Sequence, residues 1–319
     1  MPSAAPSSLA VAIAGAALVG VLAVGFALTR LRSRALARAL AWLAVVAGLV
    51  AVLLACPEAP PGFRMFAICG VVLFAMKGVV AVEERHAHDR RLAAVPWIAW
   101  AAFWPGMRPE LFAAIPWRPL PGAGALLRKG AVRLGLGVLL LLAARLAFAR
   151  SELLAAALAL PGLSLVLHFG LFNLLAGAWR LLGVPTYSLF DRPLAARSLS
   201  EFWSRRWNLP FTEMTQRAVY RPLLAALGRD RAAVVAFAFS GLLHELAISL
   251  PVRAGYGLPL LYFVLHGCAT RIEPRLRPAF ARRPWLAHAW TLAWLVVPMP
   301  LLFHPQFVRG VVWPLLGLG

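Results

Sequence analysis

The sequence predicts an all-helical protein that crosses a membrane several times. The chain has 319 residues, of which 61% are hydrophobic and only 14% are charged. Soluble globular domains average about 25% charged residues, so this composition excludes that class. The 18 Phe and 12 Trp require burial, which excludes a disordered chain, and three cysteines are too few for a disulfide scaffold. The length suffices for about eight spans of about 20 residues each.

Eight apolar runs are the expected membrane spans. They are residues 9–28, 39–55, 65–82, 134–149, 153–179, 232–250, 254–270 and 285–303. No Lys or Arg precedes the first run, so we expect a span there and not a cleaved signal peptide. In residues 92–119, Pro and Trp interrupt short apolar pieces, which favours an interfacial or re-entrant segment. With no internal repeat or linker, residues 1–319 are predicted to form a single membrane-embedded domain.

The basic residues of the chain indicate its orientation in the membrane. There are 32 basic and 12 acidic residues, a formal net charge of +20, and the charges lie between the apolar runs. They form no single basic face, so we expect no nucleic-acid partner. If the N-terminus is outside, residues 180–231 and 271–283 both become cytoplasmic. We attribute the strong bias for arginine over lysine to a GC-rich genome, and we expect a protein of a bacterial inner membrane.

Residues 184–223 are longer than a connector between two spans needs to be. Ser198 followed by Glu201 is a capping-box pattern that starts a helix. Pro210 disfavours helical geometry in the residue before it, so the predicted helix covers residues 199–208. We place the segment on the cytoplasmic side.

The predicted helix has two different faces. Trp203 and Trp207 are four residues apart on one face and suit a membrane interface. Glu201, Arg205 and Asn208 share another face, which can point into a cavity. An amphipathic helix that only lies on the membrane surface explains the pattern equally well.

The span at residues 232–250 contains His244 and Glu245 in the middle of an apolar run, with Ser240 one turn earlier. Ionisable groups inside a membrane are costly, so they indicate a functional site unless a neighbouring helix satisfies them. The zinc-protease pattern needs a second histidine four residues after His244, but that position is Ile248, so no metal site is expected. Three lone histidines occur in other apolar spans, and the sequence does not select among them: His168, His266 and His288.

Three stretches resemble the membrane-bound O-acyltransferase superfamily, in its wax-synthase-like branch. They are SLSEFWSRRWN (198–208), AVYRPL (218–223) and SGLLHE (240–245), and the resemblance is strongest over residues 184–250. It implies a helical bundle around a central chamber, with acyl-CoA entering from the cytoplasm and a hydroxyl acceptor arriving from the membrane or the opposite side. The chain departs from the usual pattern at Glu201, Ser204 and Gln216, where Asp, Gly and Leu are frequent.

The resemblance implies an acyl-CoA-dependent O-acyltransferase that esterifies a lipophilic alcohol among membrane lipids. Acyl-CoA is then a co-substrate, and no bound cofactor is expected. His244 is the expected general base, and Asn208 is expected to orient the acceptor or donate to the thioester carbonyl. Glu245 or another acceptor can fix the tautomer of His244, but adjacent residues diverge on a helix, so Glu245 can also serve another helix. Ser240 is the rival nucleophile of a two-step route. The expected acyl-CoA-binding residues are Trp203, Arg205, Arg206, Trp207, Arg217 and Tyr220.

Three other functions stay open from the sequence. The first is transfer of a short acyl group, such as acetyl, to a sterol, terpenoid, polyketide or glycan hydroxyl. The second is a proton-coupled transporter that uses the intramembrane His and Glu, although the chain shows no paired inverted halves. The third is an inactive membrane scaffold of the same fold. The sequence does not show the acyl-chain length, the acceptor or the oligomeric state.

Overall fold

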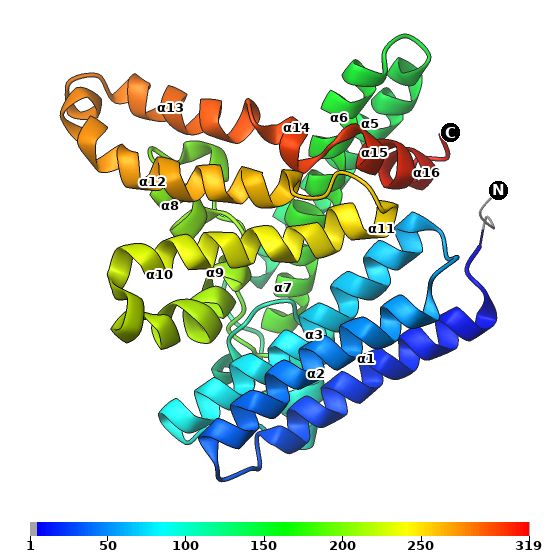
Figure 1. The fold of residues 1–319 in the computed structure, drawn as a ribbon, viewed down its shortest axis with the longest axis vertical. Coiled ribbons are helices and arrows are strands. Elements are labelled where there is room, and N and C mark those ends of the chain that lie inside the picture. The colour runs from blue at the N-terminus through cyan, green and yellow to red at the C-terminus, as the bar shows by residue number, and fades with distance from the viewer. Residues whose placement is uncertain (1–4, 319) are drawn as a thin grey trace.

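A computed structural model describes residues 5–318, and these residues are helical, with no strand among them. The first group contains α1 (Ser8–Leu28), α2 (Arg34–Ala55) and α3 (Pro61–His88), which pack against one another (Figure 1). The backbones of α1 and α3 approach so closely that a Cβ added to Gly25 would lie 3.0 Å from Cα of Gly78. Small residues thus set the spacing of this group, as is usual between membrane helices.

The prediction that residues 92–119 do not cross the membrane is consistent with the helices found there. They form α4 (Ala94–Phe103) and the short η1 (Pro109–Phe112), and ten residues of helix are too short to span the hydrocarbon core. The fully buried Lys77 of α3 holds the C-terminal end of α4. Its Nζ donates to the carbonyls of Trp104 (2.7 Å) and Gly106 (2.5 Å).

The second group is a pair of long antiparallel helical runs. One is α5 (Ala123–Phe148), and the other is continuous through α6 (Glu152–Ser164), η2 (Leu165–Leu171) and α7 (Phe172–Leu181). Glycines of α5 again permit close packing: a Cβ added to Gly130 or Gly137 would lie 2.8 Å from a backbone nitrogen of the other run.

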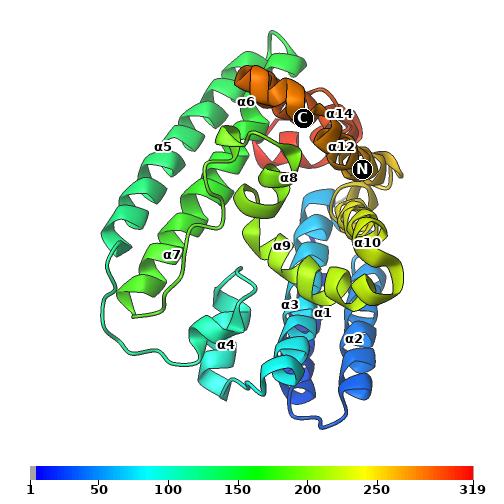
Figure 2. The ribbon, with the colours of Figure 1, turned by 90° about the vertical axis from the view of Figure 1, so that its left-hand side faces the viewer.

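The rest of the chain connects and covers these two groups (Figure 2). In Figure 2, α8 and α9 lie between the α5–α7 group and the α1–α3 group, while α10 and α12 pack together. The elements in chain order are η3 (Pro193–Ala195), α8 (Leu199–Glu201), η4 (Phe202–Arg206), α9 (Leu209–Thr215), η5 (Gln216–Tyr220), α10 (Arg221–His244), η6 (Glu245–Ser249), α11 (Leu250–Val252), α12 (Leu258–Arg282), α13 (Pro284–Val296), α14 (Met299–Leu302), α15 (Pro305–Phe307), η7 (Val308–Val312) and α16 (Trp313–Leu315).

Seven helical runs of the described chain are long and apolar enough to span a membrane. They are Ser8–Leu28, Arg34–Ala55, Pro61–His88, Ala123–Phe148, Glu152–Leu181, Leu209–Val252 and Pro284–Leu302. The sequence predicts about eight spans, and the difference is α12, where residues 254–270 were expected to cross. α12 has 25 residues, but its second half carries Arg271, Glu273, Arg275, Arg277 and Arg282.

Because successive helices run antiparallel, the loops fall at two ends of the bundle. We call the end with residues 29–33, 89–93 and 283 the arginine-rich end. The opposite end carries residues 56–60 and 253–257 and the turn after α14. The cysteines form no disulfide: Cys56 is buried at the opposite end, while Cys69 and Cys268 are exposed on the helices.

Candidate functional site

His244 is the last residue of α10 and directly precedes the π-helical turn η6. Its Nδ1 lies 2.7 Å from the backbone carbonyl of Ser240. A carbonyl can only accept, so Nδ1 carries the proton and Nε2 keeps a free lone pair. The ring packs on Phe263 with 4.2 Å between centroids, and Phe211 lies 6.0 Å away. The arrangement leaves the basic nitrogen of a neutral imidazole in aromatic surroundings.

Glu245 does not fix the tautomer of His244, contrary to one of the roles expected from sequence. Its Oε1 accepts a hydrogen bond from the backbone N–H of Leu260 in α12, at 2.9 Å. Adjacent residues diverge on a helix, so Glu245 serves a neighbouring helix instead. Ser240 contacts His244 through its backbone carbonyl.

Asn208 adopts a left-handed backbone conformation, with φ 44° and ψ 60°, which Asn tolerates better than most residues. Its Oδ1 accepts from the backbone N–H of Phe211 at 3.4 Å and caps α9. The turn carries Phe211 to the ring of His244. Asn208 and His244 therefore contact the same residue from two different elements.

The start of the helix predicted over residues 199–208 is confirmed, but its end is not. The Ser198 hydroxyl accepts from the N–H of Glu201 at 2.9 Å. The Glu201 carboxylate accepts from the N–H of Arg197 at 2.8 Å, one residue before the position that a capping box uses. This hydrogen bond is the largest cause that lowers the pKa of Glu201, and the Arg206 side chain adds to it.

The helix ends at Arg206, because Trp207 is extended, and residues 202–206 form a π-helical turn. Positions spaced by four and three residues therefore do not share a face here. The polar stripe of Glu201, Arg205 and Asn208 expected from α-helical spacing is wrong. Arg205 is exposed, whereas Asn208 lies in the next turn.

The membrane-interface position expected for Trp203 and Trp207 is also wrong. The indole N–H of Trp203 donates to Nδ1 of His266 in α12 at 3.0 Å. Trp207 stacks on Phe202, with centroids 5.5 Å apart and planes at 14°, and meets Phe190 edge-on at 5.0 Å. Both indoles pack among rings from several helices, inside the protein.

Two of the arginines expected to bind acyl-CoA are already ion-paired. Arg206 contacts Glu201, with 2.6 Å between Nη2 and Oε1. Arg217 donates to the Met107 carbonyl at 2.7 Å and to Glu110 at 3.0 Å. Tyr220, the last residue of η5, is half-buried. The structure thus does not gather the six expected residues on one surface.

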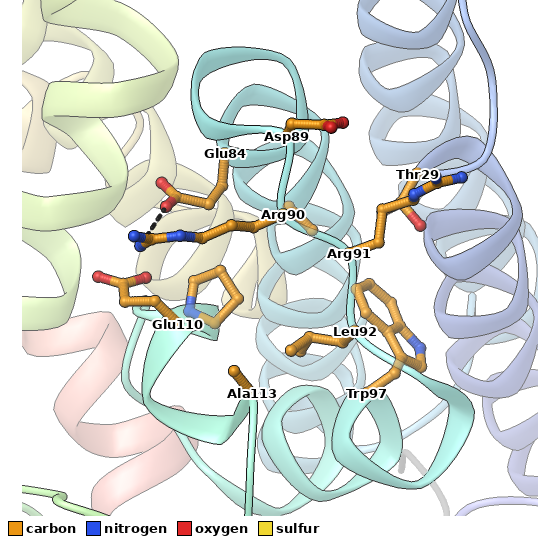
Figure 3. A pocket seen from close by; sticks show the side chains of 11 residues that line it. Thr29, Glu84, Asp89, Arg90, Arg91, Leu92, Trp97, Glu110 and Ala113 are labelled. Atoms are coloured by element: carbon orange, nitrogen blue, oxygen red, sulfur yellow. Dashed lines mark ion pairs between the residues drawn. The ribbon is translucent and has the colours of Figure 1, made fainter.

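Two pockets lie at the arginine-rich end. The first has a volume of about 310 Å³, and Figure 3 shows it between α1, α3, α4 and η1, lined by Thr29, Glu84, Asp89, Arg90, Trp97 and Glu110 among others. None of the site residues predicted from sequence lines it. The second, of about 160 Å³, is lined by Arg217 and also by Arg34, Arg38 and Arg221. The second pocket is the more basic of the two.

Sequence reasoning missed the contacts that attach residues 184–223 to the bundle. The Tyr187 hydroxyl donates to Glu213, with oxygens 2.7 and 2.8 Å away, and Arg108 donates to the same carboxylate at 2.6 Å. Burial raises the pKa of Tyr187, and the negative charge of Glu213 raises it further. The buried Glu273 of α12 accepts from the N–H of Leu199 at 2.7 Å. The sequence gave no indication that Glu213 and Glu273 make these contacts, because each is a single acidic residue among many arginines.

Each of the three lone histidines of the apolar spans lies within hydrogen-bond distance of another group. His266 is satisfied at both nitrogens, because Nδ1 accepts from Trp203 and Nε2 lies 2.8 Å from the carbonyl of Trp294. His168 lies 3.1 Å from the Ser164 hydroxyl, and His288 lies 3.2 Å from the Ala196 carbonyl. His266 is therefore a structural histidine that fixes Trp203.

Comparisons with known proteins match the part of the chain that contains these residues. Residues 186–265 match the membrane bound O-acyl transferase family. A long-chain-alcohol O-fatty-acyltransferase of Simmondsia chinensis is 34% identical over 141 residues, which is 40% of each chain. Probable long-chain-alcohol O-fatty-acyltransferase 9 of Arabidopsis thaliana is 34% identical over 144 residues, 40% of this chain and 42% of the relative.

A third relative has a different acceptor in its name. Acyl-CoA–sterol O-acyltransferase 1 of Arabidopsis thaliana is 31% identical over 133 residues, 38% of each chain. The chain thus matches about two fifths of the length of these relatives. Residues 186–265 are thus similar to the membrane bound O-acyl transferase family, and the long-chain-alcohol O-fatty-acyltransferases are similar to about two fifths of the chain.

Proposed function

We propose that the protein is an acyl-CoA-dependent O-acyltransferase that transfers a fatty acyl group to a long-chain alcohol. The relatives named as long-chain-alcohol O-fatty-acyltransferases support the reaction class. The observation that carries the proposal is the hydrogen bond from Nδ1 of His244 to the Ser240 carbonyl, because it leaves Nε2 free to accept a proton. An alcohol is a weak nucleophile at neutral pH and needs such a base.

The reaction proceeds by direct transfer. His244 Nε2 removes the hydroxyl proton as the alcohol oxygen attacks the thioester carbonyl carbon. The new C–O bond forms, the C–S bond breaks, and the proton passes to the leaving thiolate of coenzyme A. The amide of Asn208 donates to the oxygen on which negative charge develops. No acyl-enzyme is required, so Ser240 needs no nucleophilic role.

Coenzyme A approaches from the arginine-rich end, which we propose to be the cytoplasmic side of a bacterial inner membrane. Phosphates are bound well by guanidinium groups, and four of them line the second pocket, from Arg34, Arg38, Arg217 and Arg221. Three of the four already pair with carboxylates, so phosphate binding there requires these ion pairs to rearrange. The pocket's acidic neighbours Glu83 and Glu84 neutralise part of that charge. Membrane lipids surround the spans, and the acceptor alcohol reaches the site from the bilayer.

A sterol acceptor is the second candidate, because one relative is named as an acyl-CoA–sterol O-acyltransferase. It keeps the same donor and base and changes only the alcohol.

The test is thiol release from acyl-CoAs of increasing chain length by membranes that contain the protein, with lipid extracts analysed for new esters by mass spectrometry. Wild type should release thiol and form an ester whose mass identifies donor and acceptor. His244→Ala should abolish both, while His86→Ala, a histidine in the last turn of α3, should leave them unchanged. Equal thiol release by wild type and His244→Ala would refute the assignment of the base.

A further inference from the structure

A second histidine and carboxylate lie at the opposite end of the bundle and take no part in the reaction described above. His304 follows α14 and is completely buried. Glu245 directly follows His244 and begins η6. The backbone connects their surroundings: Ser249, in the same π turn as Glu245, donates to the carbonyl of Gly255 at 3.2 Å, and a Cβ added to Gly255 would lie 2.5 Å from Nε2 of His304.

His304 has a defined tautomer. The backbone N–H of Phe307 donates to Nδ1 at 3.3 Å, and Oε1 of Gln306 lies 3.1 Å from the same nitrogen. The side-chain amide of Gln306 can turn by 180° to present its N–H instead, whereas the backbone N–H of Phe307 cannot reverse its direction. A backbone N–H can only donate, so Nδ1 is the acceptor and the proton of the neutral ring lies on Nε2. Burial lowers the pKa of His304, which favours the neutral ring, while the nearby charge of Glu245 acts in the opposite direction.

Each of the two side chains has one buried polar atom with no hydrogen-bond partner in the described part of the chain. On His304 it is Nε2, a donor, and on Glu245 it is Oε2, an acceptor, since Oε1 is already bonded to the N–H of Leu260. A buried polar atom left unsatisfied costs about 1–3 kcal/mol, so native proteins rarely leave such an atom without a partner. One donor and one acceptor are complementary to a hydroxyl group, which can accept and donate at once.

We propose that Glu245 and His304 form a binding site for one hydroxyl group, whose oxygen accepts the Nε2 proton of His304 and whose proton is donated to Oε2 of Glu245. A water molecule and an alcohol both carry this group. If it is an alcohol, the proposal rests on the proposed function, and the site binds the alcohol apart from His244, because one hydroxyl group cannot donate its proton to Oε2 of Glu245 and to Nε2 of His244 at once. In that case His304 is a specificity-determining residue of the alcohol side of the reaction.

Two substitutions remove the site and keep the structural bonds of each residue. His304→Asn keeps a side-chain oxygen that accepts from the N–H of Phe307, because Asn is a good N-cap, but it removes the Nε2 donor. Glu245→Gln keeps an oxygen for the N–H of Leu260 and replaces the free acceptor by an amide donor. The two substitutions and their combination make a double-mutant cycle, measured by unfolding of the full chain in detergent.

A shared hydroxyl couples the two residues, so the double variant should be less destabilised than the two single effects predict, by about fivefold or more in the unfolding equilibrium constant. Glu110→Gln, at the arginine-rich end, combined with His304→Asn should show additive effects. Additive effects for Glu245→Gln and His304→Asn, with and without added alcohol, would overturn the proposal.

Dodecan-1-ol and 1-methoxydodecane distinguish the two sources of the hydroxyl. If the site takes an alcohol, dodecan-1-ol should increase the coupling and the ether, which cannot donate, should not. His304→Asn should then raise KM for dodecanol about tenfold and change kcat less than threefold. Coupling that neither compound changes identifies water. Failure of the proposed function would appear as absence of turnover in wild type, and the unfolding cycle would remain readable.

Discussion

The indole N–H of Trp203 donates to Nδ1 of His266 at 3.0 Å, and the other nitrogen of that imidazole lies 2.8 Å from the carbonyl of Trp294. Three elements, η4, α12 and α13, are thus linked through one fully buried histidine. The link determines where the chain enters the turn that contains Asn208. The stability of this link is therefore coupled to the geometry of the candidate site.

Trp203→Phe should destabilise the protein by about 1–3 kcal/mol, because it leaves the buried Nδ1 of His266 without a donor. Thermal unfolding in detergent measures the effect. Trp285→Phe is the matched control, since that indole is 64% exposed, and it should change the melting temperature little. Equal effects of the two substitutions would show that the hydrogen bond contributes nothing.

Lys77→Met should destabilise the protein by about 1–3 kcal/mol, because it leaves buried carbonyls without a donor. The amino group of Lys77 donates to two carbonyls at the end of α4, and Met fills similar space without donating to them. Lys129 is the only other lysine in the sequence, so Lys129→Met provides the control. Chemical unfolding of both variants under one condition shows whether the buried donor is required.

Asn208→Asp should separate the capping role of this residue from its proposed catalytic role. Asp keeps the oxygen that caps α9 and tolerates the left-handed conformation, so the melting temperature should fall little. It removes the amide donor, so kcat should fall about 100-fold with little change in KM for acyl-CoA. A rise in KM alone would make Asn208 a binding residue.

The ion pair of Glu201 should make stability depend on pH. The pKa of Glu201 is lowered in the folded protein, so its contribution is fully present above the unfolded value of about 4.3 and is lost as the pH falls through the folded value. Wild type should therefore exceed Glu201→Gln in melting temperature at pH 7, and the difference should shrink below about pH 4.5. A difference that stays constant from pH 7 to pH 3 contradicts this linkage.

The orientation of the bundle can be tested by labelling single cysteines in intact cells. The starting protein is a variant whose three cysteines are replaced by Ala. In it, Tyr256→Cys introduces a thiol in the loop at the opposite end, and Arg197→Cys introduces one directly before Ser198. Both parent side chains are exposed. A membrane-impermeant maleimide should label position 256 in intact cells and position 197 only after lysis. The reverse pattern would exclude the cytoplasmic position of the arginine-rich end.

The sequence predicted the membrane spans well because hydrophobicity over about 20 residues is a strong local signal. It predicted the start of the helix at Ser198 for the same reason, since a cap depends on neighbours in sequence. Residues 254–270 are the one predicted span outside the seven apolar runs, because the long helix α12 continues into a charged segment. Hydropathy is a weaker signal where one helix is apolar in one half and charged in the other.

Within the candidate site, the sequence pointed to His244 and Asn208 but not to all of their surroundings. It left open whether Glu245 or another acceptor fixes the tautomer of His244, and a carbonyl one turn earlier makes the contact. It treated Trp203 as interfacial, because His266, its partner, is 63 residues away in the sequence. His304 and Lys77 went unnoticed for a similar reason. Lone polar residues show their role only when distant elements bring partners to them.

The π-helical turn Glu245–Ser249 has a consequence for the spacing of the chain. A π turn contains about one residue more than an α turn, so each marks an inserted position at which the faces of a helix change register. Everything after Ser249 on this helical run is rotated relative to His244. Deletion of one residue in this turn would return the run to α-helical register and aim Glu245 and the residues after it at different neighbours, even though no side chain had been replaced. In this fold, the number of residues between two groups therefore determines which neighbours they contact, as much as the identity of the groups does.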